Sequence, residues 1–100
     1  MESYKLTRKL NVIAKTYLSL LKFNCDLSSL SSSHNSYIKF CSCVELSFLS
    51  LPAPLRRIIN NDFFYQDYPG WWKLCYSKHQ YLKLKELAIK KFMEAYYEIN

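Results

Sequence analysis

Apolar side chains recur at helical spacing in the first part of the chain. From Tyr4 to Leu21 most of them stand three or four positions apart, which places them on one face of an α-helix. Basic residues fall largely on the other side, namely Arg8, Lys9, Lys15 and Lys22. The pattern therefore predicts an amphipathic helix from about Lys5 to Phe23, with a stop signal at Asn24.

A serine-rich stretch from Ser28 to Ser36 follows, and its composition is typical of a linker. Asn35 or Ser36 is suited to cap a second helix. Apolar residues then continue at helical spacing, at Tyr37, Cys41, Val44, Phe48 and Leu51. A strand over Tyr37 to Cys43 remains an alternative, because aromatic and β-branched residues gather near the start of this run.

Two prolines mark the start of a third helix. Pro52 or Pro54 opens it, because proline suits the first turn of a helix but not its interior. We expect this helix to run to about Phe64, with Arg56 and Arg57 pointing away from its core face. The core face consists of Leu55, Ile58, Ile59 and Phe63. A loop with the one glycine of the chain follows, and then a short helical segment from Trp71 to Tyr76.

The last segment has the clearest helical pattern. Ser77 is a natural N-cap, and we expect the helix to run from about Lys78 to Glu98. Its apolar positions are Tyr81, Leu84, Ala88, Phe92 and Ala95, and its lysines are Lys78, Lys83, Lys85, Lys90 and Lys91. With one glycine and three prolines, the chain has too few turn residues for many short strands. We therefore predict an all-α fold, a small helical bundle.

The charge composition of the chain indicates which kind of partner it prefers. The 100 residues carry a net charge of +6, which favours a polyanionic partner, either nucleic acid or an acidic membrane surface. No run of 18 apolar residues and no signal-sequence pattern occurs, so we expect a cytoplasmic protein that does not span a membrane. The cysteines, Cys25, Cys41, Cys43 and Cys75, are then expected to be free thiols.

Catalytic and metal chemistry is not indicated. The acidic residues form no paired constellation on one helix face, and no phosphate-binding glycine loop exists. His79 follows Ser77 by two positions and lies on a different face, so it cannot serve as its base. Cys41 and Cys43 would diverge on a helix, which does not fit a zinc site with His34 or Cys25. We expect no enzymatic activity and no cofactor.

The last three segments have the order and scale of a helix-turn-helix unit. In such a unit the second helix buries one face and presents its first residues to the major groove of DNA. Lys78, His79, Gln80 and Lys83 are the candidates for that contact, and a glutamine can bond an adenine edge with both amide atoms. The candidates for phosphate contacts are Arg56, Arg57, Lys73, Lys85 and Lys90.

The stretch from Tyr76 to Ile89, YSKHQYLKLKELAI, resembles the recognition helix of phage late-transcription activators of the ArpU and RinA type. More distantly it is similar to region 4 of sigma-70 factors, and Leu51 to Ile59 resembles the first helix of that unit. Two departures stand out, since Cys75 occupies the place of the turn glycine and Pro69 to Trp72 replaces the middle helix.

This resemblance implies a transcription regulator or sigma-like factor, with double-stranded DNA and RNA polymerase as partners. It implies a C-terminal sigma-region-4-like helix-turn-helix domain over residues 36–100. Residues 1–35 then form an N-terminal helix and linker, and that helix is a candidate element for a homodimer.

Other hypotheses stay open. The chain is alternatively a protein-interaction module with a degenerate helix-turn-helix, which would dock through its first helix or through Trp71 and Trp72. A structured-RNA binder would use the same basic face. The tryptophans themselves are expected to pack in the core rather than to stack on single-stranded bases. Lysine-rich helix faces are also often merely solvated.

Overall fold

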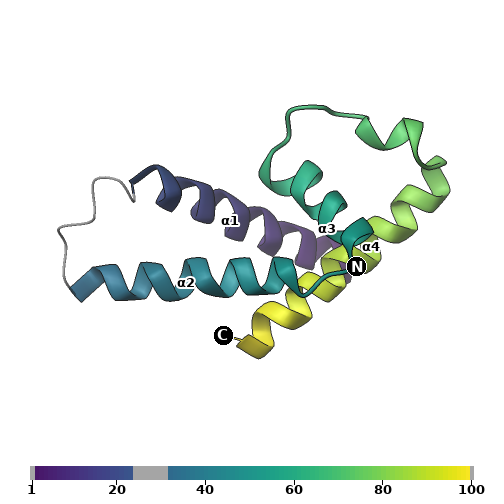
Figure 1. Cartoon of the computed structure of the whole chain (residues 1–100). Coiled ribbons are helices and arrows are strands. Elements are labelled where there is room, and N and C mark those ends of the chain that lie inside the picture. The colour runs from purple at the N-terminus through teal and green to yellow at the C-terminus, as the bar shows by residue number, and fades with distance from the viewer. Residues whose placement is uncertain (1, 24–31, 100) are drawn as a thin grey trace.

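The computed structural model describes residues 2–23 and 32–99, and these residues form only helices and connections (Figure 1). The elements are α1 (Glu2–Phe23), α2 (Ser32–Leu49), α3 (Ala53–Ile59), η1 (Asn60–Phe64), η2 (Trp71–Leu74) and α4 (Lys78–Ile99). The prediction of an all-α helical bundle is confirmed. The alternative of a strand from Tyr37 to Cys43 is wrong, because this segment lies inside α2.

The start of the second helix differs from its prediction. α2 begins at Ser32, ahead of the caps expected at Asn35 and Ser36, so part of the expected serine-rich linker is helical. Serine is only mildly unfavourable in a helix, and a helix that packs on others can therefore extend through several serines. The rest of that linker, from Ser28 to Ser31, lies outside the described residues.

α4 is the central helix of the fold. It contacts α1, α2 and α3, whereas α1 and α2 lie side by side and α4 crosses them near one end (Figure 1). The apolar face expected on α4 explains this position, because Tyr81, Ala88 and Phe92 are buried, together with Ile89 and Met93. None of the described helices is long and apolar enough to cross a membrane.

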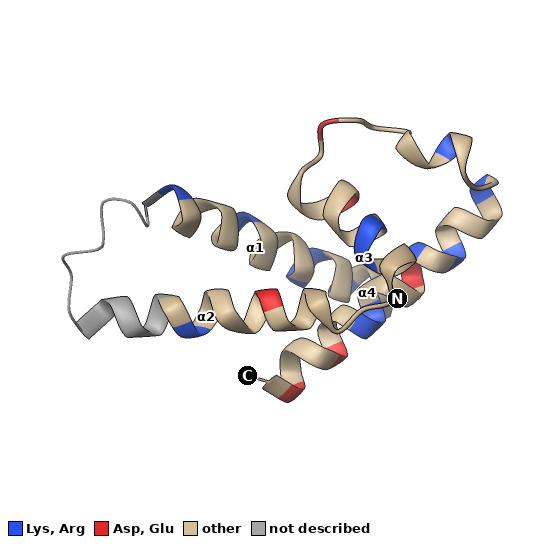
Figure 2. Cartoon of the chain, viewed as in Figure 1, with Lys and Arg blue, Asp and Glu red and all other residues tan. Residues whose placement is uncertain are grey.

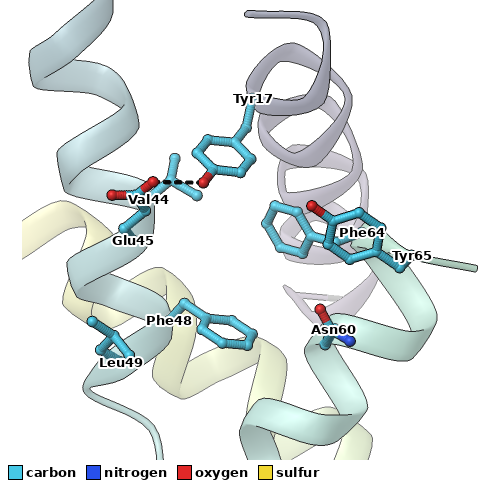
Figure 3. Close-up of a pocket in the computed structure, with 8 residues that line it drawn as sticks. All are labelled: Tyr17, Val44, Glu45, Phe48, Leu49, Asn60, Phe64 and Tyr65. Atoms are coloured by element: carbon cyan, nitrogen blue, oxygen red, sulfur yellow. Dashed lines mark hydrogen bonds between the residues drawn. The ribbon is translucent and has the colours of Figure 1, made fainter. Parts of the chain in front are cut away.

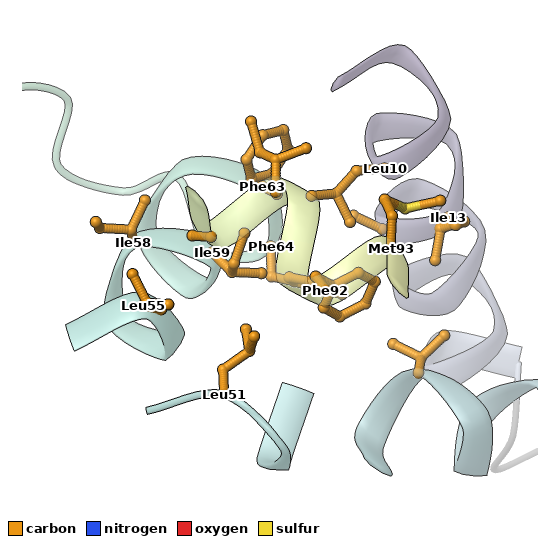
Figure 4. Packing of buried hydrophobic residues seen from close by; sticks show 14 residues of the cluster. Leu10, Ile13, Leu51, Leu55, Ile58, Ile59, Phe63, Phe64, Phe92 and Met93 are labelled. Carbon is orange, nitrogen blue, oxygen red and sulfur yellow. The ribbon is translucent and has the colours of Figure 1, made fainter. Parts of the chain in front are cut away.

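One core joins residues from all the α-helices and from η1 (Figure 4). Phe92 is fully buried at its centre, with its ring centroid 6.4 Å from that of Phe64. The first helix contributes Leu10, Ile13 and Ala14 to the same cluster. Residues on both sides of the boundary expected at 35/36 therefore share one hydrophobic core, and the N-terminal helix is part of the packed bundle.

The helix that begins after Pro52 ends in a π-helical turn. The backbone N–H of Arg56 donates to the carbonyl of Pro52 at 2.9 Å, which is ordinary α-helical geometry. At η1 the N–H of Tyr65 instead donates to the carbonyl of Asn60, five residues earlier, at 2.8 Å. Such turns are rare and are frequent at functional sites. The predicted end of this helix at Phe64 is confirmed.

Gly70 makes the turn that leads into η2. Its φ of 78° is left-handed, which explains a glycine at this position. Cys75 has a φ of −107°, so the absence of glycine there is no obstacle to the turn before α4. The predicted short helix, Trp71 to Tyr76, is a shorter 3₁₀ segment that ends at Leu74.

Candidate nucleic-acid interface

α4 starts with a reciprocal cap. The backbone N–H of Gln80 donates to Ser77 Oγ at 3.2 Å, and the N–H of Ser77 donates to Gln80 Oε1 at 3.1 Å. This is a capping box, and it satisfies two backbone donors that the first turn leaves without a helical partner. The predicted N-cap is confirmed. Because the amide oxygen of Gln80 is engaged in the cap, bonding an adenine edge with both amide atoms would require it to leave the cap.

The first two turns of α4 expose the residues predicted to contact the major groove. Lys78, His79 and Lys83 are exposed, as is Gln80, while Tyr81 on the opposite face is buried. Further along the same helix Lys90 and Lys91 are also exposed. Basic residues follow the first part of α4, whereas its last turns carry Glu94 and Glu98 (Figure 2). The helix therefore has its positive end at the start, next to η2.

Asp62 fixes this end of α4 to the rest of the bundle. Its Oδ1 accepts a hydrogen bond from Trp71 Nε1 at 3.0 Å, and its Oδ2 accepts one from the Tyr81 hydroxyl. The Lys85 Nζ lies 3.5 Å from the same Oδ2. Burial, and next the hydrogen bond to Asp62, raises the pKa of Tyr81, so its phenol stays a protonated donor. One carboxylate thus links η1, η2 and α4.

Lys85 is less available for DNA than predicted. Besides its ion pair with Asp62, its Nζ lies 5.6 Å from the ring centroids of both Phe63 and Tyr81. Arg56 is also drawn inward, since its Nε is buried without a hydrogen-bond partner among the described residues. Of the residues expected near phosphates, Arg57, Lys73 and Lys90 are exposed.

Both tryptophans pack against Tyr81. The Trp72 ring stacks on the Tyr81 ring with centroids 4.4 Å apart and planes 8° apart, and Trp71 meets the same ring edge-on at 6.3 Å. On the outside, the Arg57 guanidinium lies 5.3 Å from the Trp71 ring centroid and the Lys73 ammonium 6.0 Å from that of Trp72. Both rings are half-buried and hold η2 against α4, and Trp71 also packs against the core cluster.

Sequence reasoning missed two features of this surface. The acidic residues were considered only for catalysis, although one of them, Asp62, joins the three elements. Leu74, at the end of η2, is 98% exposed, so its whole side chain is available to solvent or to a partner. The run of aromatic and basic residues from Trp71 to Tyr81 was the one signal in the sequence that could have indicated that η2 packs against the start of α4.

The described cysteines show no arrangement for metal binding or catalysis. Cys41, Cys43 and Cys75 are free thiols, and no cluster of three or more potential metal ligands occurs among the described residues. Burial raises the pKa of the Cys41 and Cys43 thiols, which disfavours the reactive thiolate. Cys25 lies outside the described residues, as does the side chain of His34.

Comparison of the chain with protein-family models, with curated proteins and with solved structures gave no match. We therefore infer function from the geometry and charge of the residues themselves.

Proposed function

We propose that this protein is a DNA-binding transcription regulator that places the first turns of α4 in the major groove. The observation that carries the proposal is the joint exposure of Lys78, His79 and Lys83 at the start of a helix whose other face is anchored. A rigid helix start with free basic side chains can enter a groove with little loss of conformational entropy. The order of α3, η2 and α4 supports a helix-turn-helix unit of this kind.

The residues divide into two roles in this proposal. Lys78, His79 and Lys83 lie at the groove, where they meet base edges and the nearest phosphates. Arg57, Lys73 and Lys90 are exposed around them and contact the phosphate backbone. A regulator of the sigma-like type would also contact RNA polymerase, and exposed apolar residues such as Val12 on α1 and Leu46 on α2 are candidates for that contact.

A salt series on random-sequence duplex DNA tests the proposal. Neutralising about four phosphates gives a slope near −3.6 in a plot of log affinity against log salt concentration. The Lys78→Ala/Lys83→Ala variant removes two of these contacts, and its slope should fall to about −1.8. Gln80 is left unchanged, because its loss would also remove a helix cap.

The matched control is Lys15→Ala/Lys22→Ala, which removes the same charge from exposed positions of α1. It should bind DNA almost as the wild type does. Equal weakening by both double variants would mean that only net charge matters and would contradict a site on α4. A folded wild-type protein that does not bind at low salt would contradict DNA binding altogether.

A protein-interaction module is the second candidate, and one observation favours it. Leu74 is 98% exposed and Leu82 is 50% exposed, both next to the start of α4. Exposed leucines of this kind are available for contact with a partner protein. Under this hypothesis Leu74→Ser/Leu82→Ser would abolish binding to a partner such as RNA polymerase, whereas Lys78→Ala/Lys83→Ala would change it little.

A further inference from the structure

A pocket of about 250 Å³ lies between α1, α2 and η1 (Figure 3), and its described lining includes no residue of α4. Four aromatic rings surround it: Tyr17 from α1, Phe48 from α2, and Phe64 and Tyr65 from the π-helical turn and the residue after it. The volume is just below about 300 Å³, the lower end for ordinary small-molecule sites, so an occupant would be small.

The rings stand at steep angles to one another. The centroids of Tyr17 and Phe64 are 5.7 Å apart with their planes at 84°, and those of Phe48 and Phe64 are 6.3 Å apart at 75°. Each pair is in edge-to-face contact, so an occupant would lie beside these rings, which border the pocket from different elements. Aromatic side chains that line a pocket attract cations, because the face of each ring carries a partial negative charge.

A carboxylate stands at the edge of the same pocket. Glu45 Oε2 accepts a hydrogen bond from the Tyr17 hydroxyl at 2.7 Å, which holds the carboxylate beside the rings (Figure 3). No Lys or Arg side chain pairs with Glu45 within the described part of the chain. Burial and the neighbouring Glu45 raise the pKa of Tyr17, so the phenol remains protonated and keeps donating this bond.

The charge of the pocket selects the charge of its occupant. Of the described residues that line it, Glu45 alone carries a formal charge, although the whole chain carries a net charge of +6. Because Glu45 is exposed and already accepts the Tyr17 hydrogen bond, a neutral occupant would gain nothing from its charge, and an anion would be repelled by it. A positively charged group with an apolar surface satisfies both the rings and the carboxylate.

We propose that this pocket binds a small organic ammonium ion, with its alkylated nitrogen among the rings of Tyr17, Phe48, Phe64 and Tyr65 and with Glu45 as its counter-ion. The residues of the π-helical turn complete the enclosure, which gives that uncommon geometry a role. The proposal does not depend on DNA binding, because none of these residues belongs to α4.

Titration of the full chain with choline, followed by nuclear magnetic resonance, tests the proposal. Choline should shift the resonances of the pocket rings in a saturable way. Its neutral carbon isostere, dimethylbutanol, has nearly the same shape without the charge and should bind at least about tenfold more weakly. Equal binding of the two compounds, or no saturable shift with the folded protein, would overturn the proposal.

Two substitutions locate the site. Glu45→Gln keeps the shape of an exposed side chain and should weaken choline binding by about tenfold, and Phe48→Leu by about fivefold. The controls are Glu94→Gln and Tyr68→Leu, which remove a charge and a ring at exposed positions that do not line the pocket. Choline binding by Glu45→Gln at wild-type strength would refute the role of the carboxylate.

Both pocket variants should bind DNA as the wild type does. Failure of choline binding would therefore leave the proposal for α4 unaffected, and failure of DNA binding would leave this one unaffected.

Discussion

Asp62 is a partly buried carboxylate, with its side chain 11% exposed, and it is surrounded by groups that stabilise its charge. Two hydrogen-bond donors, from Trp71 and Tyr81, and the ammonium of Lys85 compensate for the lost hydration. The sequence contained no sign of this role, because Tyr81 lies 19 positions further along the chain. The exposed lysines of α4, by contrast, were predictable from helical spacing alone.

Removal of this carboxylate should destabilise the protein. In Asp62→Ala the indole N–H of Trp71 and the hydroxyl of Tyr81 lose their acceptor, and we expect the free energy of unfolding to fall by about 2–3 kcal/mol. Urea unfolding followed by tryptophan fluorescence measures this change. Asp67→Ala, in the exposed loop, is the control and should change stability by less than about 0.5 kcal/mol. Equal effects of the two substitutions would contradict the linking role.

At the scale of elements, local signals accounted for most helix boundaries. Ser77 and Gln80 define the start of α4 through contacts within four residues, and Pro52 and Pro54 define the start of α3. The start of α2 could not be located in this way, because the serines ahead of it permit either a linker or a helix. The π-helical form of η1 was not predictable either, since no side-chain pattern specifies it.

The cap of α4 predicts a defined loss of stability. Ser77→Ala removes the acceptor for the Gln80 N–H, and the free energy of unfolding should fall by about 1 kcal/mol. Thermal unfolding measured by circular dichroism reports this loss. Ser42→Ala, at an exposed position in the middle of α2, is the control and should be neutral or slightly stabilising. A destabilisation of Ser42→Ala as large as that of Ser77→Ala would argue against the cap.

At the scale of the whole molecule, α1 belongs to the same core as the C-terminal helices. Leu10 and Ala14 are fully buried in the cluster that also holds Ile58 and Phe92. The serine-rich stretch suggested that residues 1–35 are separate from residues 36–100. The apolar face of α1 nevertheless packs against the apolar faces of the later helices, which buries all of them in one core. We therefore expect the described residues to unfold in one cooperative transition.

A substitution in the core face of α1 should change the unfolding of η2, which is distant from it in the sequence. Leu10→Ala creates a cavity in the shared core and should lower the free energy of unfolding by about 2–5 kcal/mol. Because both tryptophans lie in η2, the midpoint of their fluorescence change in urea should fall together with the circular dichroism signal. An unchanged tryptophan midpoint would mean that α1 folds separately. Val12→Ala, at an exposed position, is the control.

Helices, their apolar faces and the basic character of α4 follow from the sequence, because each depends on residues three or four positions apart. The position of Asp62 between two elements, the four rings around one pocket and the shared core depend on contacts between residues far apart in the chain. Such contacts depend on which apolar helix faces pack against one another. The local pattern does not determine this, because many pairings of amphipathic helices satisfy it equally well. The tertiary structure therefore decided which charged residues remain free and which aromatic rings enclose a site.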